Sequence, residues 1–449
     1  MFLLNALTTA MHSECAIPKS EDKMIHHFKA EQTDAGLNFD IQLDKDKKVY
    51  CFIGENSVGK TNLLENMAKI FICSHSIWKE HDDNPGNLDS SIFSCNKQLF
   101  DNSDLPKNFL INGEEIHFAK ILSHTENTTH ANLILWNHSF TYIGAKERGF
   151  TQNIDKNHVK ILGDKYDRFV EAFTRSFRYM TGQTVEDTAI ADWFNSRLII
   201  NPAYISQDEN RLFEVLTVLE LMQALEPGLK GLIVKKNGEI RPDISFSEGK
   251  LCFNRIPIDK LSTGFVSIIK IFQEIIAGYG GWGGLHGETD LKNMDGVVFI
   301  DEIESHLHPK WQYRFIPLLK KFFPNTTFYI ATHSPTIVST TDEGEAYELI
   351  RKGNDVTAKR LGNPREWYLV DVFSQGFHVD FDEMEETESE APSLADMLRN
   401  FSEMVKDYTI RKDDGLKQKI EALYQKILPS LPKDDPRRRS LDSLKGLVR

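Results

Sequence analysis

The chain has 449 residues, of which 40% are hydrophobic and 27% charged, and its formal net charge is −13. The length predicts two or three domains of a soluble globular protein, and no apolar run approaches the ~20 residues that a membrane helix needs. The acidic balance disfavours adhesion of the whole surface to nucleic acid, although it leaves room for a local basic groove.

The N-terminus and the cysteines indicate the compartment. The first residues, Met1 to Leu7, are mildly apolar but short and lack a positively charged segment, so we interpret them as a mature terminus and not a signal peptide. The five cysteines are scattered and include no C-x-x-C pair, which argues against a zinc site and a disulfide framework. We therefore expect a cytoplasmic protein without a membrane segment.

The most informative stretch is residues 54–61, which spell G-x-x-x-x-G-K-T. A strand with clean alternation is predicted over 37–42, and the apolar run 48–53 leads directly into the motif. Residues 62–71 follow as an amphipathic helix. Strand, glycine loop and helix in this order indicate a phosphate-binding loop, whereas a glycine turn before an ordinary helix is the simpler alternative.

This loop predicts a set of ligand contacts. Backbone N–H groups and the positive helix N-terminus would hold phosphate oxygens, Lys60 would reach the β and γ phosphates, and the Thr61 hydroxyl would hold Mg²⁺. We therefore expect ATP and Mg²⁺ as ligands. The predicted nucleotide contacts in this stretch are Gly54, Asn56, Ser57, Val58, Gly59, Lys60, Thr61 and Asn62.

Residues 73–250 are predicted to form a large insertion. Its first part is polar and rich in turns, residues 131–136 resemble a strand, and helices are expected at about 165–182 and 210–226. No heptad pattern is sustained over many turns, so we predict a compact, mainly helical lobe and not a long coiled coil.

A helix is predicted to begin at Leu261–Phe265, where Ser262 and Gly264 offer a hydroxyl and free N–H groups to an anion. A serine and a glycine at a helix start are common, so this signal alone is weak. Its position between the glycine loop and the acidic strand described next strengthens it.

Residues 296–302 predict a buried central strand that ends in two carboxylates. After a phosphate-binding loop, Asp301 would complete the coordination of Mg²⁺, and Glu302 would polarise the attacking water as general base. The alternative is a strand end capped by two solvated acids.

A second apolar strand, 327–332, leads to His333, which can bond the γ-phosphate or the attacking water. A lone histidine usually belongs to packing, but this one follows the acidic strand by a single further strand. We therefore count His333, with Glu302 and Lys60, among the catalytic residues. The intervening stretch, 309–323, has the spacing of a helix packed on the core.

The C-terminal part begins with an acidic run within residues 380–390, typical of a solvated linker, with a docking tail for a basic partner as the alternative. Residues 392–449 resemble a helical tail with two amphipathic faces and a basic end at 437–449. These faces would pack on their own domain or dock a subunit or partner. The basic end is too short to claim contact with DNA.

The four motifs in this order resemble the ATPase heads of the ABC type, the class that includes transporter nucleotide domains, SMC heads and RecF. The resemblance makes 54–61 the Walker A motif, 261–265 the signature, 297–302 the Walker B motif and His333 the switch histidine. In that family two heads sandwich ATP, so Ser262 and Gly264 would act on a nucleotide held by Lys60 and Thr61 of the other subunit. Segment 305–309 would be the D-loop, which crosses the dimer interface.

The sequences of 301–309 and 331–335 point to a smaller group within this class. They resemble ATPases of OLD-type proteins and of prokaryotic anti-phage systems, most of all the PtuA ATPases of Septu-type systems, also found with retrons, and next those of PARIS systems. Ser57 stands where related heads usually carry glycine, and glycine-rich residues 278–284 lengthen the spacing as an insertion. No Q-loop glutamine can be assigned, although Gln152 is a weak candidate.

These observations predict an α/β fold: an ABC-type head with a mixed sheet flanked by helices, a mainly helical insertion and a helical C-terminal tail. The expected parts are 1–72 and 251–376 for the head, 73–250 for the insertion, 377–391 for an acidic linker and 392–449 for the tail.

The first functional hypothesis is a slow, regulatory ATPase of a defence complex. It would form a head-to-head dimer or higher homo-oligomer that restrains or delivers a separate effector nuclease, of the HNH type if the system is Septu-like. No nuclease motif is found in this chain. The second hypothesis is a RecF- or SMC-like repair ATPase that binds DNA directly. A membrane transporter ATPase is the least favoured.

Overall fold

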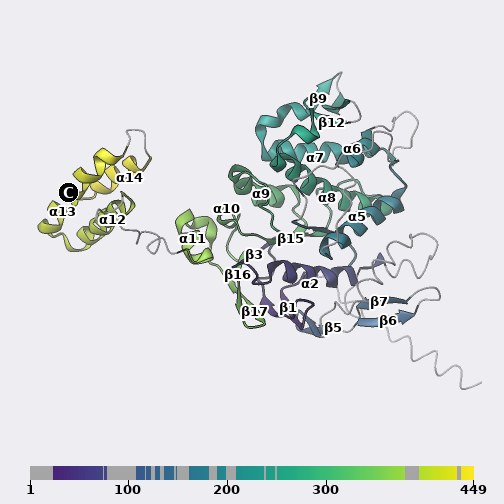
Figure 1. Ribbon diagram of the computed structural model, residues 1–449, viewed down its shortest axis with the longest axis horizontal. Coiled ribbons are helices and arrows are strands. Elements are labelled where there is room, and N and C mark those ends of the chain that lie inside the picture. The colour runs from purple at the N-terminus through teal and green to yellow at the C-terminus, as the bar shows by residue number, and fades with distance from the viewer. Residues whose placement is uncertain are drawn as a thin grey trace, which may run out of the picture. The chain divides into compact units, whose positions relative to one another are not determined.

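The computed structural model describes residues 24–73, 75–77, 108–116, 118–122, 127–131, 136–145, 148, 161–181, 190–198, 209–236, 239–247, 250–379, 394–431 and 436–448 (Figure 1). The chain divides into a first unit, Met1–Val379, and a second, Asp380–Arg449. Gln152 and the acidic run at 380–390 lie outside the described residues. The division of the sequence into five parts stays a prediction.

The first unit is built on a ten-stranded mixed sheet. Five adjacent strands, from β16 to β8, run parallel, whereas the other half contains antiparallel pairs, among them β1 with β2 and β16 with β17. In spatial order the strands are β5 (Glu114–Ile116), β4 (Asn108–Ile111), β1 (His27–Glu31), β2 (Asn38–Gln42), β17 (Asp355–Arg360), β16 (Ala346–Lys352), β3 (Val49–Ile53), β15 (Thr326–Ala331), β14 (Gly296–Ile300) and β8 (Ser139–Ile143).

Helices cover both faces of the parallel half. The helices of the first unit are α2 (Lys60–Cys73), α5 (Lys165–Met180), α6 (Ile190–Leu198), α7 (Leu212–Leu225), α8 (Thr263–His286), α9 (Pro309–Phe322), α10 (Pro335–Val338) and α11 (Leu369–Phe377), with short 3-10 turns η3 (Pro227–Leu232), η4 (Ile258–Lys260) and η5 (Pro364–Glu366). Helix α2 lies on one side of the sheet, and α5, α7, α8 and α9 lie on the other (Figure 1).

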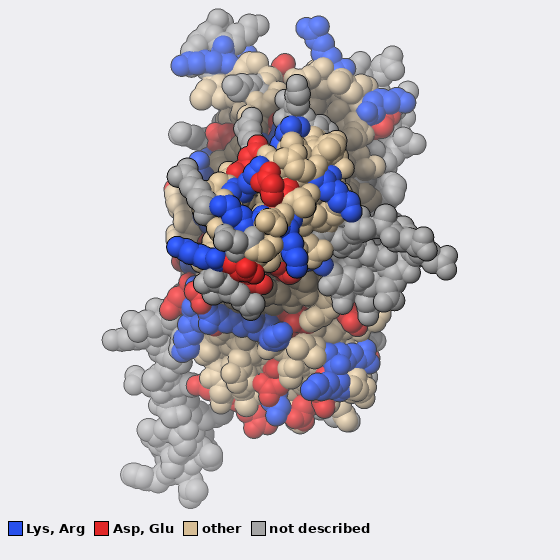
Figure 2. Space-filling view, turned by 90° about the vertical axis from the view of Figure 1, so that its left-hand side faces the viewer, with Lys and Arg blue, Asp and Glu red and all other residues tan. Residues whose placement is uncertain are grey.

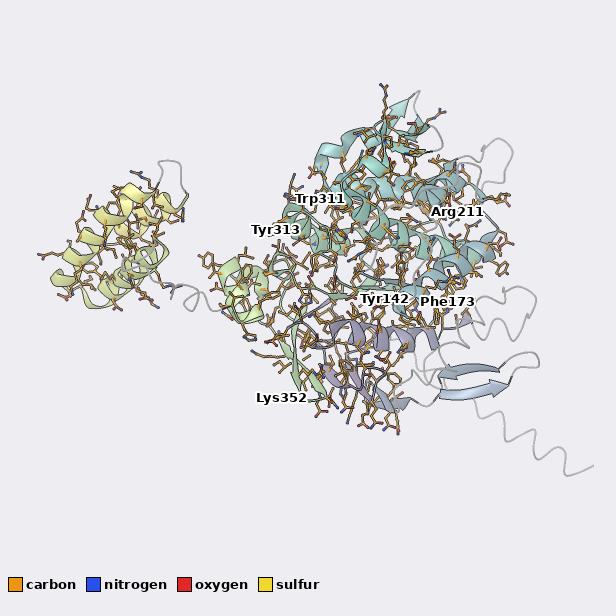
Figure 3. All side chains as sticks on the ribbon, viewed as in Figure 1. Tyr142, Phe173, Arg211, Trp311, Tyr313 and Lys352 are labelled. Atoms are coloured by element: carbon orange, nitrogen blue, oxygen red, sulfur yellow. The ribbon has the colours of Figure 1, made fainter. Side chains whose placement is uncertain are left out.

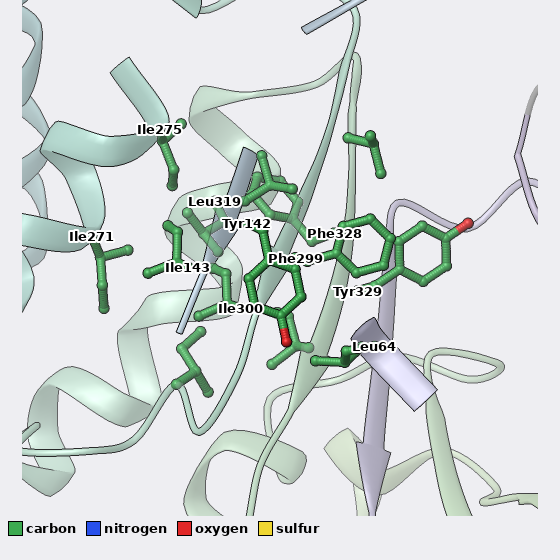
Figure 4. Close-up of a cluster of buried hydrophobic side chains, with 14 of the residues drawn as sticks. Leu64, Tyr142, Ile143, Ile271, Ile275, Phe299, Ile300, Leu319, Phe328 and Tyr329 are labelled. Carbon is green, nitrogen blue, oxygen red and sulfur yellow. The ribbon is translucent and has the colours of Figure 1, made fainter. Parts of the chain in front are cut away.

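The central strands are buried along their whole length, as expected for strands covered on both faces. Their side chains alternate between the two layers. Phe299 and Tyr329 stack on each other at 4.9 Å between ring centroids and meet Phe71 of α2. Phe328 points to the opposite face, toward Phe323 at the end of α9. Figure 4 shows Leu64 of α2 on one side of this cluster and Ile271, Ile275 and Leu319 on the other.

Parts of segment 73–250, which the sequence predicts to form an insertion lobe, contribute strands to the sheet of the first unit. Strands β4, β5 and β8 of this segment belong to the large sheet, and α5 and α7 pack along α8. Smaller sheets are formed by β6 (Phe118–Leu122) with β7 (Asn127–Ala131), β9 (Ile233–Lys236) with β10 (Glu239–Pro242), and β11 (Ile244–Ser247) with β12 (Lys250–Phe253) and β13 (Ile256–Pro257). Local patterns identify strands but not the sheet that they join, which depends on pairing partners far away in sequence.

Residues 278–284, the glycine-rich stretch that lengthens the spacing between the signature and Asp301, form the second half of α8. A Cβ at Gly278 would lie 2.1 Å from the Thr141 hydroxyl oxygen, and one at Gly281 would lie 2.9 Å from Phe169 Cα. Missing side chains thus let β8 and α5 approach the helix axis. Close packing offsets the weak intrinsic helix preference of glycine.

A buried ionic cluster fastens α6 and α7 to this helix. Glu214, fully buried on α7, accepts from Arg197 at 2.5 Å and from Arg211 at 2.6 Å, and Arg211 also donates to the Gly280 carbonyl at 2.7 Å (Figure 3). Burial alone would raise the pKa of Glu214, but the two guanidinium groups hold it below its usual value. The carboxylate occupies the space beside Gly280, where a Cβ would lie 2.4 Å from it.

The second unit consists of α12 (Leu394–Arg411), α13 (Asp414–Ile427), a 3-10 turn η7 (Leu428–Ser430) and α14 (Pro436–Lys445). It has a hydrophobic core of its own, formed by Phe401, Val405, Tyr408, Ile420, Ile427, Leu431 and Leu441. Among the described residues of both units, no helix has the length and apolarity needed to cross a membrane.

Candidate nucleotide site

The loop of residues 54–59 joins β3 to α2 at the carboxyl end of the parallel strands. Gly54, Ser57 and Gly59 have positive φ values of 146°, 64° and 108°. A Cβ at Gly59 would lie 2.7 Å from Leu37 Cδ1, and one at Gly54 would lie 2.9 Å from the Leu349 carbonyl oxygen, so both positions require glycine.

Ser57 is the position where this motif departs from its relatives, and it takes up the left-handed conformation nevertheless. Such a conformation costs a non-glycine residue about 1–2 kcal/mol. Arg351 of β16 donates to the Ser57 carbonyl at 3.0 Å, which helps to hold the loop in this shape.

The Lys60 side chain forms hydrogen bonds with the backbone of the glycine loop. Its ammonium group donates to the carbonyls of Gly54 at 2.8 Å and Glu55 at 2.9 Å, and the side chain is buried. Burial lowers its pKa to about 8, against the opposing effect of the carboxylates of Asp301, Glu304 and Glu302. A buried cation held only by carbonyls and nearby acids is suited to a polyanion such as a triphosphate.

Thr61 and Asp301 meet at the start of α2. The Thr61 hydroxyl donates to Asp301 Oδ2 at 2.9 Å. The other carboxylate oxygen, Oδ1, is buried and has no hydrogen-bond partner among the residues that the structure describes. Burial raises the pKa of Asp301, with Glu302 adding to this and Thr61 and Arg148 opposing it. A hydroxyl beside an unpaired carboxylate oxygen fits the oxygen donors that Mg²⁺ prefers.

The remaining predicted contacts of the loop lie in different settings. Asn56 is exposed and Val58 is buried. The Asn62 side chain donates to Asp34 Oδ1 at 2.6 Å and accepts from the Thr33 hydroxyl at 2.9 Å. It therefore ties α2 to the turn between β1 and β2, and only its backbone is left to face a phosphate.

Glu302 is the second residue after β14 and is exposed. It has a φ of 44°, and its Oε2 accepts from the Ser305 hydroxyl at 3.0 Å. Its carbonyl accepts from Arg148.

His333 is held against the same segment. Glu304 accepts from the Thr332 hydroxyl at 2.5 Å and from the His333 backbone N–H at 2.6 Å. Burial and the nearby Lys60 lower the pKa of His333, which keeps the imidazole neutral at pH 7. The ends of β14 and β15 thus present Asp301, Glu302 and His333 beside the glycine loop.

A cavity of about 830 Å³ opens over the outer side of this loop. Gly54 to Val58 and His333 line one side of it, and the end of β16 with the end of α11 lines the other. Sequence reasoning missed the second wall, which includes Glu348, Arg351 and His378. The His378 imidazole pairs with the Glu348 carboxylate. No sequence pattern marks these residues, since the pairing of β16 with β3 brings Glu348 and Arg351 to the site and His378 comes from the end of α11.

The signature residues begin α8. Ser262 is its N-cap and accepts from the Phe265 N–H at 3.2 Å. A Cβ at Gly264 would lie 2.5 Å from the His306 carbonyl oxygen and 3.2 Å from Trp311, which Figure 3 labels on α9. Within the described chain no hydrogen bond joins Ser262 or Gly264 to residues 54–61. The signature packs instead on its own predicted D-loop.

Comparison with known proteins yields one family model, described as "AAA domain, putative AbiEii toxin, Type IV TA system", over residues 285–339. The Septu protein PtuA of Bacillus thuringiensis is 28% identical over 203 residues, 44% of this chain and 46% of that protein. The Retron Ec83 probable ATPase of Escherichia coli is 40% identical over 80 residues, 17% of this chain and 15% of that protein. The chain therefore spans less than half the length of these two relatives.

Among solved structures, the SMC head bound to the C-winged helix domain of ScpA covers 75% of this chain and 97% of its own, at 11% identity and a TM-score of 0.36. None of these comparisons concerns PARIS systems, so that resemblance stays a prediction. The motifs and the mixed sheet resemble those of ABC-type P-loop ATPases, and the chain is similar in sequence to proteins of prokaryotic Septu and retron systems, one of them named as a probable ATPase.

Proposed function

We propose that this chain binds and slowly hydrolyses ATP as a subunit of an anti-phage defence complex. The observation that carries the proposal is the pairing of Thr61 with Asp301 at the N-terminus of α2, where the other buried carboxylate oxygen has no hydrogen-bond partner among the described residues. That arrangement suits a Mg²⁺–triphosphate and has no evident structural purpose, because an unpaired buried carboxylate oxygen is costly.

In the proposed binding step, the N–H groups of the glycine loop and Lys60 hold the phosphates, and Thr61 with Asp301 holds Mg²⁺. The metal would neutralise the negative charge that develops on the transferred phosphoryl group. Lys60 would exchange the carbonyls of Gly54 and Glu55 for phosphate oxygens. Its buried ammonium group would then form hydrogen bonds to a negatively charged partner, which are stronger than those to neutral carbonyls.

In the proposed hydrolytic step, the Glu302 carboxylate takes a proton from water while the water oxygen bonds to the γ-phosphorus. The bond from this phosphorus to the oxygen bridging to the β-phosphate breaks, and ADP and phosphate leave. His333, with a neutral imidazole, would orient the water or the γ-phosphate. Glu304 accepts from the His333 backbone N–H, so the position of His333 is tied to the segment that follows β14 and carries Glu302.

The site would be completed in trans. Ser262 and Gly264 make no hydrogen bond to the glycine loop of their own chain in the described part, so their predicted role requires a second copy facing the first. Head-to-head dimerisation would therefore accompany ATP binding, and opening would follow hydrolysis. Through this cycle the chain would restrain or deliver a separate effector nuclease.

The test combines nucleotide turnover with partner capture. Glu302→Gln should bind ATP as the wild type does but hydrolyse it about 10²- to 10⁴-fold more slowly, because the water loses its base. Normal turnover by this variant would refute the assignment of the base.

Co-purification with the product of the neighbouring gene, followed by nuclease assays with and without ATP, tests the defence role. A stable complex whose DNA cleavage depends on ATP supports it. ATP-stimulated DNA binding by the purified chain alone, without such a partner, would favour a repair ATPase instead.

A further inference from the structure

An arginine that no sequence motif marks lies beside the end of β14, where Asp301 and Glu302 follow. Strand β8 runs parallel to β14 with Ile143 opposite Ile300, and the Asp301 N–H donates to the Ile143 carbonyl at 2.9 Å. The chain that leaves β8 therefore runs beside the end of β14. Arg148 comes five residues after the last residue of β8, and its side chain is fully buried there.

The environment of Arg148 is unusual for a purely structural arginine. One guanidinium nitrogen, Nη2, donates to the Glu302 carbonyl. The other two, Nε and Nη1, are buried without a hydrogen-bond partner among the described residues. Burial lowers the pKa of Arg148, and the charges of Asp301, Glu304 and Glu302 act against this. A guanidinium group stays charged in proteins. These carboxylates therefore offset part of the free-energy cost of burying the charge.

The residue that Arg148 contacts is held in an unfavourable backbone conformation. With a φ of 44°, Glu302 lies in the left-handed region, which persists for a non-glycine residue only where its surroundings impose it. Arg148 holds the carbonyl of Glu302 from within the protein, and the Ser305 hydroxyl holds its carboxylate at the surface. Together these two bonds fix the direction in which the carboxylate points.

We propose that Arg148 is a positioning residue for ATP hydrolysis, which fixes the Glu302 peptide and sets a buried positive charge near Asp301 and Glu302. The inference rests on the proposed function, since it concerns the hydrolytic step of the same site. Arg148 donates to the Glu302 carbonyl, and in the described part of the chain no hydrogen bond joins it to residues 54–61. Its loss should therefore slow hydrolysis while leaving nucleotide affinity nearly unchanged.

Three substitutions separate its two contributions. Arg148→Lys keeps the positive charge with a different donor geometry, Arg148→Gln keeps a donor without the charge, and Arg148→Ala removes both. Arg168→Gln serves as the matched control. Arg168 is a buried arginine on α5 that donates to the Gly163 carbonyl at 2.9 Å and contacts none of the site residues in the described chain.

The experiment measures, for each purified full-length variant, the affinity for a fluorescent ATP analogue with Mg²⁺ and the rate of single-turnover hydrolysis. We expect Arg148→Ala and Arg148→Gln to lose about 100-fold or more in rate, with affinity within about threefold of the wild type, and Arg148→Lys to recover part of the rate. Arg168→Gln should keep both quantities near the wild-type values.

Several outcomes would overturn the inference. Normal hydrolysis by Arg148→Gln, or an equal loss of affinity and rate in Arg148→Gln and Arg168→Gln, would reduce Arg148 to a structural role. If Arg148→Ala does not fold, Arg148→Lys and Arg148→Gln still decide the question. A wild-type chain without ATPase activity would refute the proposed function itself. If the wild type hydrolyses ATP and Glu302→Gln does not, the proposed function stands, and the Arg148 variants then test the positioning role alone.

Discussion

At the scale of single residues, the site is organised around charges kept out of water. Lys60 is buried and donates to carbonyls, one oxygen of Asp301 has no hydrogen-bond partner in the part of the chain that the structure describes, and buried Arg148 donates to the Glu302 carbonyl. Buried charges without full partners lower the stability of the folded chain when no ligand is bound. The same charges are already in place to bind a triphosphate and a divalent cation.

This tension gives a prediction for Lys60→Met. The pKa of Lys60 is about 8 in the folded chain, below its unfolded value, so burying the charged form opposes folding below pH 8. That penalty fades as the pH rises from 8 toward the unfolded value. Lys60→Met should therefore abolish ATP binding while raising the unfolding free energy at pH 7 by about 1–3 kcal/mol.

Urea unfolding at pH 7 and pH 10 checks this, with exposed Lys48→Met as the control. The stability gain of Lys60→Met over the wild type should shrink at the higher pH. A variant less stable than the wild type at pH 7 would contradict the account of the buried charge.

The sequence predicts the residues of the phosphate loop and the two strand ends well, because each chemical group sits within a few residues of its motif. It misses Glu304 and Ser305 as positioning residues, although both lie within the quoted motif, because their hydrogen bonds depend on the turn that follows β14. Arg148, Arg351 and His378 carry no local signal. Strand pairings of distant segments bring Arg148 and Arg351 to the site, and His378, at the end of α11, pairs with Glu348 of β16.

At the scale of elements, helix α8 is the hub of the first unit. It carries the signature at its N-terminus and accepts β8, α5 and α7 along its glycine-rich half. The strand and helix patterns themselves could be predicted. The close contacts that favour glycine at 278–284 cannot be predicted from the sequence, because they are made by side chains of distant segments.

Two alanine substitutions in α8 test this packing. Gly280→Ala would place a Cβ 2.4 Å from the Glu214 carboxylate, whereas Gly284→Ala has no contact closer than 3.5 Å. We expect Gly280→Ala to lower the unfolding free energy by about 1–3 kcal/mol through overpacking. Gly284→Ala should be neutral or stabilising by up to about 1 kcal/mol, because alanine favours helix.

Thermal or urea unfolding of the two variants side by side gives the answer. Equal unfolding free energies of the two variants would show that close contacts do not require glycine at position 280.

At the scale of the whole molecule, the two units have separate cores. In the view of Figure 2, the described Lys and Arg side chains are interspersed with Asp and Glu side chains. The oligomeric state, the effector and the trigger depend on other molecules, and this sequence alone could not decide them.

Separate cores predict separate unfolding. Phe401→Ala in the second unit and Phe272→Ala in the first each remove a fully buried ring, which costs about 3–5 kcal/mol. Each substitution should lower one calorimetric transition and leave the other in place. ATP with Mg²⁺ should raise only the transition that Phe272→Ala lowers. A single transition that both substitutions shift together would show that the units unfold as one.

The central claim, a nucleotide site completed by a second copy, is tested most directly by complementation. Lys60→Ala removes the phosphate grip, and Ser262→Arg blocks the signature, so each variant alone should hydrolyse almost no ATP. In an equal mixture, mixed dimers keep one intact site, and activity should return to about a quarter of the wild-type value. A mixture no more active than its components, or a Ser262→Arg variant as active as the wild type by itself, would contradict the claim.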